Sequence, residues 1–313
     1  MVDRAFKDNS VNVVFCAGNN YLKYTAVALM SLIENSDKNR NYDIVILETN
    51  NEENAKDLIS DMVKDCKNFS VRFFNISEYF DKYRSENMVS HHYYSKEIFM
   101  RIFIPDILTN YDKVIYLDSD IIVTTDIGKL FDMDLEGNYL GAVRDFNSIT
   151  NMQYMPEMRS YFKEFLGIEK MGLYFNSGVL LMDLNLLREI KLVQKSMELL
   201  KRFDSLKYPD QDILNIICTD NHLLIDGSWN FTFAINAILV QNSALRDFAL
   251  DWCKGLITPN IIHYITEFKP WNTPMSYSDV WWIYAAKTPF FEKLKEEFNI
   301  ALASGHYGNI LNV

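Results

Sequence analysis

The sequence predicts an α/β fold: a Rossmann-like, doubly wound sheet in a single domain. Apolar runs of strand length alternate with helical segments through the first half of the chain, which is typical of parallel βαβ units. The 313 residues are 49% hydrophobic, which is enough to bury one large core. No internal repeat, low-complexity segment or linker interrupts the sequence, so we expect one fold with elaborations.

The first half of the chain is predicted to alternate between strands and helices. The strands, which are short and apolar, are expected at residues 11–17, 43–47, 71–76 and 113–120. The helices, which contain no Gly, are expected at 21–35, 52–64 and 95–108, the last of them broken near Pro105. In sheets of this kind ligands bind beyond the carboxyl ends of the strands, so we expect functional side chains there.

The second half of the chain is less regular. Strands are expected at 139–145 and 174–184, and the Met- and Tyr-rich stretch between them, 146–170, indicates helices and loops. A long helix is expected at 185–203 and another at 210–218. We expect a catalytic domain at 1–272 and a C-terminal helical extension, packed on the same domain, at 273–313.

Charge and cysteine content exclude several classes of protein. The net charge is −11 and the pI about 5.0, so the chain should repel nucleic acid, and an anionic substrate would need a metal or a few well-placed cations. The four cysteines form no CxxC motif, and we expect reduced thiols in a cytoplasm, with Cys16 and Cys218 in the core. The N-terminus is polar, unlike a signal peptide, and no run of about 18 apolar residues indicates a membrane span.

The segment VIYLDSDIIV, residues 114–123, resembles one buried strand with two carboxylates inside it. Residues i and i+2 of a strand point to the same face, so Asp118 and Asp120 would stand side by side. Adjacent buried carboxylates need a cation between them, and hard oxygen ligands at the end of a strand suit Mg²⁺ or Mn²⁺. The alternative is a solvated turn with the strand ending at Leu117, and the apolar residues 121–123 argue against it.

A metal held by two carboxylates needs a third ligand, and His263 is the candidate. Taken alone, a histidine after an apolar run is more often a core residue than a ligand. Lys269 lies six residues further on, followed by Pro270 and Trp271, and would supply the cation that a metal-bound diphosphate requires. The nearby lysine therefore favours ligation.

Four motifs follow one another in the chain: YLDSD at 116–120, FNSGVLLMDL at 175–184, DQDILN at 210–215 and HY....KPW at 263–271. Together, over roughly residues 11–271, the chain resembles the family 8 retaining glycosyltransferases, which include glycogenin and bacterial lipopolysaccharide galactosyl- and glucosyltransferases. The resemblance implies a mixed sheet of the glycosyltransferase A type. It also implies an enzyme that uses Mn²⁺, with Mg²⁺ as the alternative, to move glucose or galactose from a UDP-sugar donor to a carbohydrate or glycolipid acceptor.

The same resemblance implies roles for individual residues. The metal ligands would be Asp118, Asp120 and His263, and Lys269 would stabilise the leaving diphosphate. The donor would be bound by residues from the strand ends and loops: Ala17, Asn20, Tyr21, Arg101, Asp118, Ser119, Asp145, Asn176, Ser177 and Lys269. Taken alone, Arg101 would more simply be a charge on the helix surface.

Catalysis is assigned to Asp210 and Gln211, together with Lys269, by the resemblance. The two residues would face the anomeric carbon, although Asp210 and Asp212 would also suit the start of the following helix. An amide such as Gln211 is a poor nucleophile. A front-face route, in which the diphosphate oxygen takes the proton of the acceptor hydroxyl, is therefore favoured over a two-step route through a carboxylate, and the sequence leaves both open.

Two positions depart from the family pattern. Gly18 stands where relatives carry an acidic residue that contacts uracil, although Tyr21 keeps a face for stacking on the base. Thr266 replaces a glycine whose backbone approaches the phosphates. Both changes put the strength of donor binding in question, and neither removes a metal ligand.

Two other functions stay open. A haloacid-dehalogenase-type phosphohydrolase also carries Asp-x-Asp after an apolar strand, but the Gly-Thr that normally follows is missing here, and about three elements precede the pair. A non-catalytic nucleotide-sugar-binding protein of the same fold is favoured by Gly18 and Thr266 and disfavoured by the complete set of metal ligands.

The aromatic segment 280–294 could either contact a membrane surface or pack into the core. Its flanking residues are not net basic, so its attraction to anionic lipid is weak and core packing is favoured. We expect a cytoplasmic protein and leave open a peripheral position on the inner face of the cell membrane. The donor sugar, the acceptor, the linkage and the oligomeric state cannot be read from the sequence.

Overall fold

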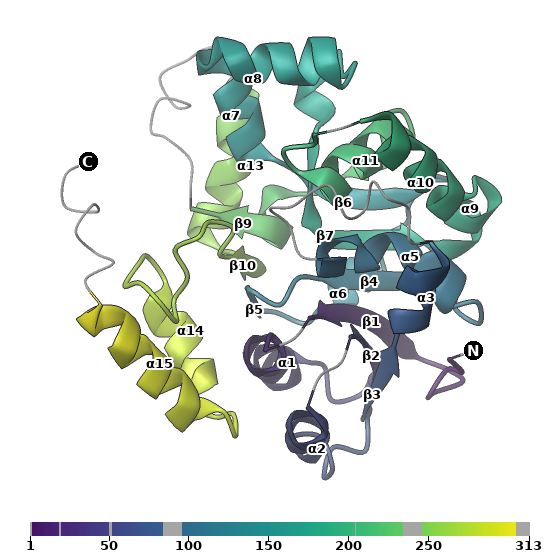
Figure 1. Ribbon diagram of the computed structural model, residues 1–313. Helices are drawn as coiled ribbons and strands as arrows, with labels where there is room; N and C mark the ends of the chain where they lie inside the picture. Colours follow the sequence, from purple (N-terminus) through teal and green to yellow (C-terminus); the bar gives the residue numbers. More distant parts are fainter. Residues whose placement is uncertain are drawn as a thin grey trace.

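The computed structural model of the protein describes residues 2–18, 20–49, 52–83, 96–203, 205–233 and 246–304 (Figure 1). Within these residues the chain forms a seven-stranded sheet, in the order β3-β2-β1-β4-β7-β6-β8, and a three-stranded sheet, in the order β5-β10-β9. The strands are β1 (Ser10–Ala17), β2 (Asn41–Glu48), β3 (Phe69–Asn75), β4 (Lys113–Leu117), β5 (Ile121–Val123), β6 (Leu140–Arg144), β7 (Phe175–Asp183), β8 (His222–Leu224), β9 (Phe231–Thr232) and β10 (Ile261–His263).

The large sheet is mixed, as predicted. Strands β1 to β4 run parallel, β7 is antiparallel to its neighbours β4 and β6, and β8 is parallel to β6. The carboxyl ends of β1, β4 and β6 therefore lie at the same edge of the sheet as the amino end of β7. This edge collects residues that are far apart in the sequence.

Helices cover both faces of the large sheet (Figure 1). The helices of the described residues are α1 (Leu22–Asn35), α2 (Glu53–Asp61), α3 (Ser77–Lys82), α5 (Met100–Ile107), α6 (Gly128–Phe131), α7 (Phe146–Tyr154), α8 (Pro156–Ser160), α9 (Leu184–Glu189), α10 (Leu192–Arg202), α11 (Pro209–Cys218), α13 (Arg246–Ile257), α14 (Ser278–Ala285) and α15 (Phe291–Ala303). Alternate residues of β1 enter different cores: Val13 and Phe15 pack with α1 and α14, and Val14 packs with α5. The doubly wound architecture is confirmed.

The strand expected at 114–123 is in fact two strands. β4 ends at Leu117, and β5 leaves the large sheet to pair with β10 in the small one. Residues 121–123 are apolar because they are buried in this second sheet, not because the first strand continues. Asp118 and Asp120 therefore lie in the connection between the sheets, and the period-2 argument for their common face was wrong.

Two predicted helices also differ from the structure. The helix expected at 185–203 is divided into α9 and α10 because Lys191 between them has a left-handed φ of 57°, which an α-helix cannot include. The helix expected to break near Pro105 instead runs through it to Ile107, because the missing proline N–H costs a single hydrogen bond so close to the helix end. Residue 95, the expected start of this helix, lies outside the described residues.

The C-terminal helices α14 and α15 pack against α1. Trp281, Phe290 and Leu294 are buried, which confirms core packing for this part of the aromatic segment. Lys23 of α1 forms an ion pair of 2.5 Å with Glu297 of α15. The division of the chain at residue 272 stays a proposal, and part of the expected extension, 305–313, lies outside the described residues.

All four cysteines are free thiols, and Cys218 is buried as expected, whereas Cys16 is partly exposed. Among the residues that the structure describes, no helix combines the length and the apolar character needed to cross a membrane.

Candidate active site

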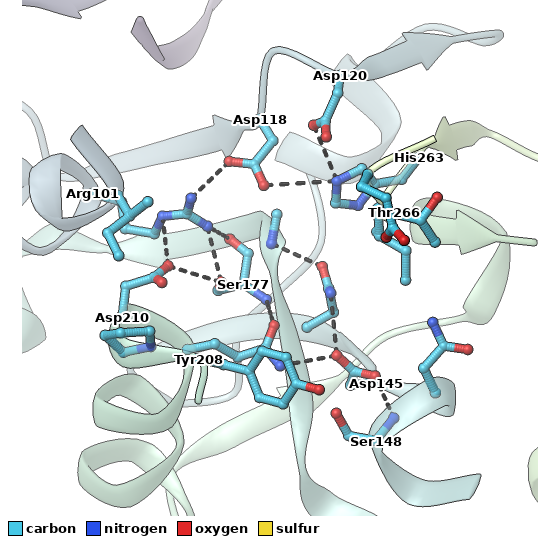
Figure 2. Close-up of a pocket in the computed structure, with 18 of the residues that line it drawn as sticks. Arg101, Asp118, Asp120, Asp145, Ser148, Ser177, Tyr208, Asp210, His263 and Thr266 are labelled. Atoms are coloured by element: carbon cyan, nitrogen blue, oxygen red, sulfur yellow. Dashed lines mark hydrogen bonds and ion pairs between the residues drawn. The ribbon is translucent and has the colours of Figure 1, made fainter. Parts of the chain in front are cut away.

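The predicted functional residues gather at one edge of the large sheet. Asp118 follows β4, Asp145 follows β6 and Asn176 lies at the start of β7, so the mixed sheet places all three together. Arg101 reaches the same edge from α5. A pocket of about 480 Å³ lies between these side chains, with the carboxylates that follow β4 at one end and Asp145 at the other (Figure 2).

The small sheet brings His263 to the two carboxylates. In the antiparallel pairing of β5 and β10, His263 pairs with Ile121, the residue that follows Asp120. Its Nε2 atom lies 3.2 Å from Asp120 Oδ1 and 3.7 Å from Asp118 Oδ2. One potential ligand atom from each of these three residues lies within 4.8 Å of the others. The three residues predicted as metal ligands are thus together, although by a route the sequence did not indicate.

The chemistry of this donor set fits a divalent metal ion. His263 Nδ1 lies 2.8 Å from the amide oxygen of Asn230, a contact that requires a proton on Nδ1 and leaves the Nε2 lone pair facing the carboxylates in a neutral ring. Three lone-pair donors directed at one point repel each other unless a cation lies between them. The glycine at position 178 keeps this space open, because a Cβ there would lie 2.2 Å from His263 Cε1 and 2.7 Å from Asp118 Oδ2. Carboxylate and imidazole ligands together suit Mn²⁺.

Two cations flank the carboxylates. Arg101 is buried rather than a surface charge, and its Nη2 donates to Asp118 Oδ1 at 2.9 Å. Lys269 Nζ lies 2.5 Å from Asp120 Oδ2. Burial favours the neutral form of Asp120, but the adjacent Lys269 ammonium opposes it, and the pKa of this carboxyl lies well below its usual range. Asp120 is therefore a charged ligand at any ordinary pH.

A second network, of amides and carboxylates, forms the other end of the pocket. Gln211 Nε2 donates to Asp145 Oδ2 at 2.9 Å, and Gln211 Oε1 accepts the backbone N–H of Ser177 at 3.0 Å. Asp145 Oδ1 accepts the N–H of Ser148 at 2.8 Å and thereby caps α7. Asn176 Nδ2 donates to Asp145 Oδ2 at 3.3 Å. These bonds fix which atom of each side chain faces which neighbour.

Asp210 lines the pocket, and its carboxylate is held by an ion pair with Arg101 and a hydrogen bond from Ser177. Its Oδ2 lies 3.0 Å from Arg101 Nε and accepts a hydrogen bond from Ser177 Oγ at 3.1 Å. Burial, opposed by Arg101 and reinforced by the charge of Asp118, raises the pKa of Asp210. The residue is not the helix cap: Tyr208 occupies the cap position of α11, and Asp210 lies in its first turn, where the helix dipole favours a negative charge.

Asp212, two residues further along α11, points away from the pocket. Its carboxylate accepts hydrogen bonds from the hydroxyls of Tyr174, at 2.7 Å, and Tyr161, at 2.5 Å, and from the N–H of Tyr208, at 3.0 Å. Burial raises the pKa of Asp212 to about 6 despite these bonds. The side chain thus stabilises the start of α11 and its surroundings.

Nine of the predicted site residues line the pocket: Arg101, Asp118, Asp120, Asp145, Asn176, Ser177, Asp210, Gln211 and His263. Thr266 lines it too, with its hydroxyl bonded to the carbonyl oxygen of Phe268 at 3.0 Å. Lys269 adjoins the pocket through Asp120. The Ser119 hydroxyl is instead 2.8 Å from that of Thr25, outside the pocket lining, so a side-chain contact with the donor is not supported for Ser119.

The three residues predicted to bind the nucleotide base lie beyond the pocket lining, between β1 and α1. Ala17 ends β1, and Asn20 has a left-handed φ of 68°, which turns the chain toward α1. Tyr21 is half exposed, and its ring meets that of Tyr24 edge to face at 5.4 Å. Tyr24 in turn stacks on Trp271 at 3.9 Å. The half-exposed ring of Tyr21 thus packs against the Tyr24–Trp271 stack and lies within the electrostatic influence of Asp120.

Several residues of the site were not predicted from the sequence. Asn230 contacts His263, and the Tyr116 hydroxyl donates to Asp118. Asn147 and Asn151, four residues apart on α7, line the pocket, and the buried Oδ1 of Asn147 has no hydrogen-bond partner among the residues that the structure describes. The i, i+4 spacing of these two amides directly after Asp145 was a readable signal, whereas Asn230 gave none.

Residues 12–274 match the family model described as glycosyl transferase family 8. A putative glycosyltransferase of Haemophilus influenzae is 30% identical over 71% of this chain and 64% of its own length. A lipopolysaccharide 1,2-glucosyltransferase of Escherichia coli is 30% identical over 60% of this chain and 52% of its own length. The chain is thus shorter than these two relatives and spans less than two thirds of each.

The fold is shared with a solved structure of the galactosyltransferase LgtC in complex with donor and acceptor sugar analogues. The TM-score is 0.73 at 23% identity, and the alignment covers 89% of this chain and 96% of that one. The fold is of the glycosyltransferase A type, and it holds a candidate metal site beside a polar pocket. The chain belongs to glycosyl transferase family 8. This membership excludes the phosphohydrolase alternative.

Proposed function

We propose that the protein is a retaining hexosyltransferase that moves glucose or galactose from a UDP-sugar to a hydroxyl of a carbohydrate or glycolipid acceptor, with Mn²⁺ as its metal and Mg²⁺ as the alternative. The observation that carries the proposal is that three metal-ligating side chains, two cations and an oriented amide–carboxylate network meet around one pocket. Family membership supports glycosyl transfer, and the name of the Escherichia coli relative supports a hexose and a carbohydrate acceptor.

The end of the pocket that carries Asp118, Asp120 and His263 suits a metal-bound diphosphate. When bound there, the metal would supply positive charge to the leaving diphosphate. Lys269, whose Nζ is already held by Asp120, is placed to bind the diphosphate oxygens as their charge develops. Tyr21, on the same side of the site, offers a ring face to the uracil.

The other end of the pocket suits the transferred sugar. Its volume of about 480 Å³ is within the usual range for small-molecule sites, about 300–1,000 Å³. The side chains of Asp145, Asn176 and Gln211 are held in fixed orientations there. Asn147 Oδ1, which has no partner among the described residues, can accept a hydrogen bond from a hydroxyl of the donor sugar or of the acceptor substrate. Polar groups in fixed orientations favour a polyhydroxylated ligand.

The surroundings of the carboxylates support a front-face retaining reaction. A two-step route needs a carboxylate free to attack the anomeric carbon. Asp210 is engaged by Arg101 and Ser177, Asp212 is turned toward tyrosines, and Gln211 is a neutral amide. We therefore propose that the acceptor hydroxyl attacks from the side of the leaving diphosphate, whose oxygen takes its proton.

The proposal is tested by incubating the purified chain with Mn²⁺ and a panel of UDP-sugars and measuring released UDP, with and without oligosaccharide acceptors. UDP release is expected from UDP-glucose or UDP-galactose and should disappear with excess chelator. Asp120→Asn should remove over about 99% of it, because metal charge stabilisation is worth several kcal/mol. Full activity in excess EDTA would disprove the metal assignment. Donor binding with no turnover of any UDP-sugar would instead favour the non-catalytic binding protein.

A further inference from the structure

A continuous chain of hydrogen bonds runs behind the pocket, from the metal-site histidine to the sugar side. His263 Nδ1 contacts Asn230 Oδ1 at 2.8 Å, and Asn230 Nδ2 donates to Asn176 Oδ1 at 2.8 Å. Asn176 Nδ2 then donates to Asp145 Oδ2, which also accepts from Gln211. Asn230 is at the centre of this chain, at the end of the short helical turn Gly227–Asn230, and is 1% exposed.

The direction of every bond in this chain is set by one backbone amide. The N–H of Gly178 donates to Asn176 Oδ1 at 2.9 Å, and a backbone N–H can only donate. Asn176 must therefore present its oxygen toward Gly178 and Asn230 and its nitrogen toward Asp145. Asn230 must in turn present its nitrogen to Asn176 and its oxygen to His263. The Nδ1 atom of His263 is then required to carry a proton, and Nε2 is left as the ligand atom.

We propose that Asn230 is a positioning residue that sets both halves of the site at once: it selects the Nδ1–H form of His263 and fixes the amide of Asn176 on the sugar side. The proposal rests on the proposed function, since it assumes a metal at His263 and a donor sugar near Asn176. Asn230 itself does not line the pocket, so it would act only through these two neighbours.

Two substitutions at this position separate the two effects. Asn230→Ala removes both hydrogen bonds. Asn230→Asp keeps an oxygen that accepts the His263 Nδ1–H, but it replaces the donor that faces Asn176 Oδ1 with a second oxygen. Asn176 then cannot satisfy both Asp145 and the new carboxylate. The alanine variant should therefore impair the metal site and the sugar site, and the aspartate variant only the sugar site.

The metal site is measured by calorimetric titration with Mn²⁺ in the absence of donor. Asn230→Ala should bind Mn²⁺ about 10- to 100-fold more weakly than the wild type, the usual effect of losing the partner of a metal-ligating histidine. Asn230→Asp should bind it at least as tightly as the wild type. Asn12→Ala serves as the matched control: Asn12 is 6% exposed, and within the described part of the chain its side chain bonds to the carbonyl of Lys113 and to Ser10, near the start of β1 and away from the pocket.

The sugar site is measured by kcat for the UDP-sugar that the wild type uses. Asn230→Asp should lower kcat about tenfold, which is the effect expected from one misplaced polar contact. The Mn²⁺ concentration that gives half-maximal activity should not change. Asn12→Ala should leave kcat and metal affinity at wild-type values. Thermal melting identifies any variant that fails to fold.

The protonation pattern of His263 gives a readout that does not depend on turnover. In protein labelled with ¹⁵N-histidine and loaded with Zn²⁺, His263, assigned from its absence in His263→Ala, should carry its proton on Nδ1. The proposal would be overturned by any one of three results. These are a proton on Nε2 of His263, Mn²⁺ binding by Asn230→Ala within about threefold of wild type, and an undiminished kcat of Asn230→Asp. If the wild type binds Mn²⁺ but transfers no sugar, the proposed function fails, and the titration and the ¹⁵N spectrum still decide this inference. If Asn230→Ala does not fold, the aspartate variant and the spectrum decide it.

Discussion

Replacing Gly178 with alanine should disrupt the proposed metal site without substituting any of its three ligand residues. Gly178 lies in β7 beside the metal-ligating residues, and its φ is one that any residue adopts, so the substitution causes no backbone strain. The added Cβ would lie 2.2 Å from His263 Cε1 and 2.7 Å from Asp118 Oδ2. The perturbation is therefore purely steric and is directed at two of the three ligands.

The size of the required movement determines the expected effect. Carbon atoms in contact are about 3.5–4.0 Å apart, so the His263 ring would have to move by about 1.3 Å or more. His263 is 2% exposed and is bonded to Asn230, and Asp118 is held by Arg101 and the Tyr116 hydroxyl. Metal–ligand distances tolerate changes of only about 0.2 Å, so we expect Mn²⁺ affinity to fall at least about 100-fold.

The assay is calorimetric titration of Gly178→Ala with Mn²⁺, together with UDP release at saturating metal. Gly141→Ala is the matched control, because Gly141 also lies in the large sheet and its new Cβ would meet no residue of the site: its nearest neighbours would be Leu135 Cδ2 at 3.1 Å, Ile225 Cγ2 at 3.4 Å and Leu181 Cβ at 3.7 Å. The control should bind Mn²⁺ like the wild type. A folded Gly178→Ala protein that binds Mn²⁺ within about threefold of wild type would refute the reasoning.

Three further predictions concern the donor site and stability. Gln211→Ala should lower kcat about 10- to 100-fold, a loss of about 1.4–2.7 kcal/mol of transition-state stabilisation. UDP affinity, measured by calorimetry, should not change, because we place this residue on the sugar side of the pocket. A glycosyl-enzyme adduct on Asp210 or Asp212, found by intact mass spectrometry, would contradict this prediction. UDP should bind better than GDP because Tyr21 keeps its stacking face, but by a small margin because Gly18 has no side chain; tighter GDP binding would show that the loop has another role. The raised pKa of Asp212, about 6, means that its contribution to stability is complete below about pH 4 and is lost as the pH rises through about 6. In urea unfolding, the stability of the wild type relative to Asp212→Asn should therefore fall by up to about 3 kcal/mol between pH 4 and 7, and a constant difference would contradict it.

The fold could be predicted because its strands and helices alternate with clear periodicity. The point where the prediction failed, residues 114–123, shows the limit of that signal. Apolar residues on both sides of Asp118 and Asp120 are equally compatible with one long strand and with two strands in different sheets. Only the pairing with β10, some 140 residues away, distinguishes these arrangements, and such long-range pairing has no local signature.

The grouping of the three proposed metal ligands and Lys269 could be predicted because their chemistry is unusual for their positions: carboxylates after an apolar strand, and a cation beside a histidine. The supporting residues are ordinary by comparison. Asn230 is a buried amide at the end of a short turn, and nothing within its own segment indicates that it contacts His263, 33 residues later. The resemblance placed Ser119 in the donor site, but its hydroxyl contacts that of Thr25, and no pattern in the sequence indicates the direction of this side chain.

The charge balance of the site links its two ends. Five carboxylates line the pocket, those of Asp118, Asp120, Asp145, Asp210 and the exposed Glu267, whereas the cations at the site among the described residues are Arg101 and Lys269. This excess of negative charge favours the binding of a divalent metal ion. A diphosphate adds further negative charge and would be repelled by the pocket alone. We therefore expect the metal to bind before the nucleotide or together with it, so that the acidic pair serves as the means by which a chain of net charge −11 holds an anionic donor.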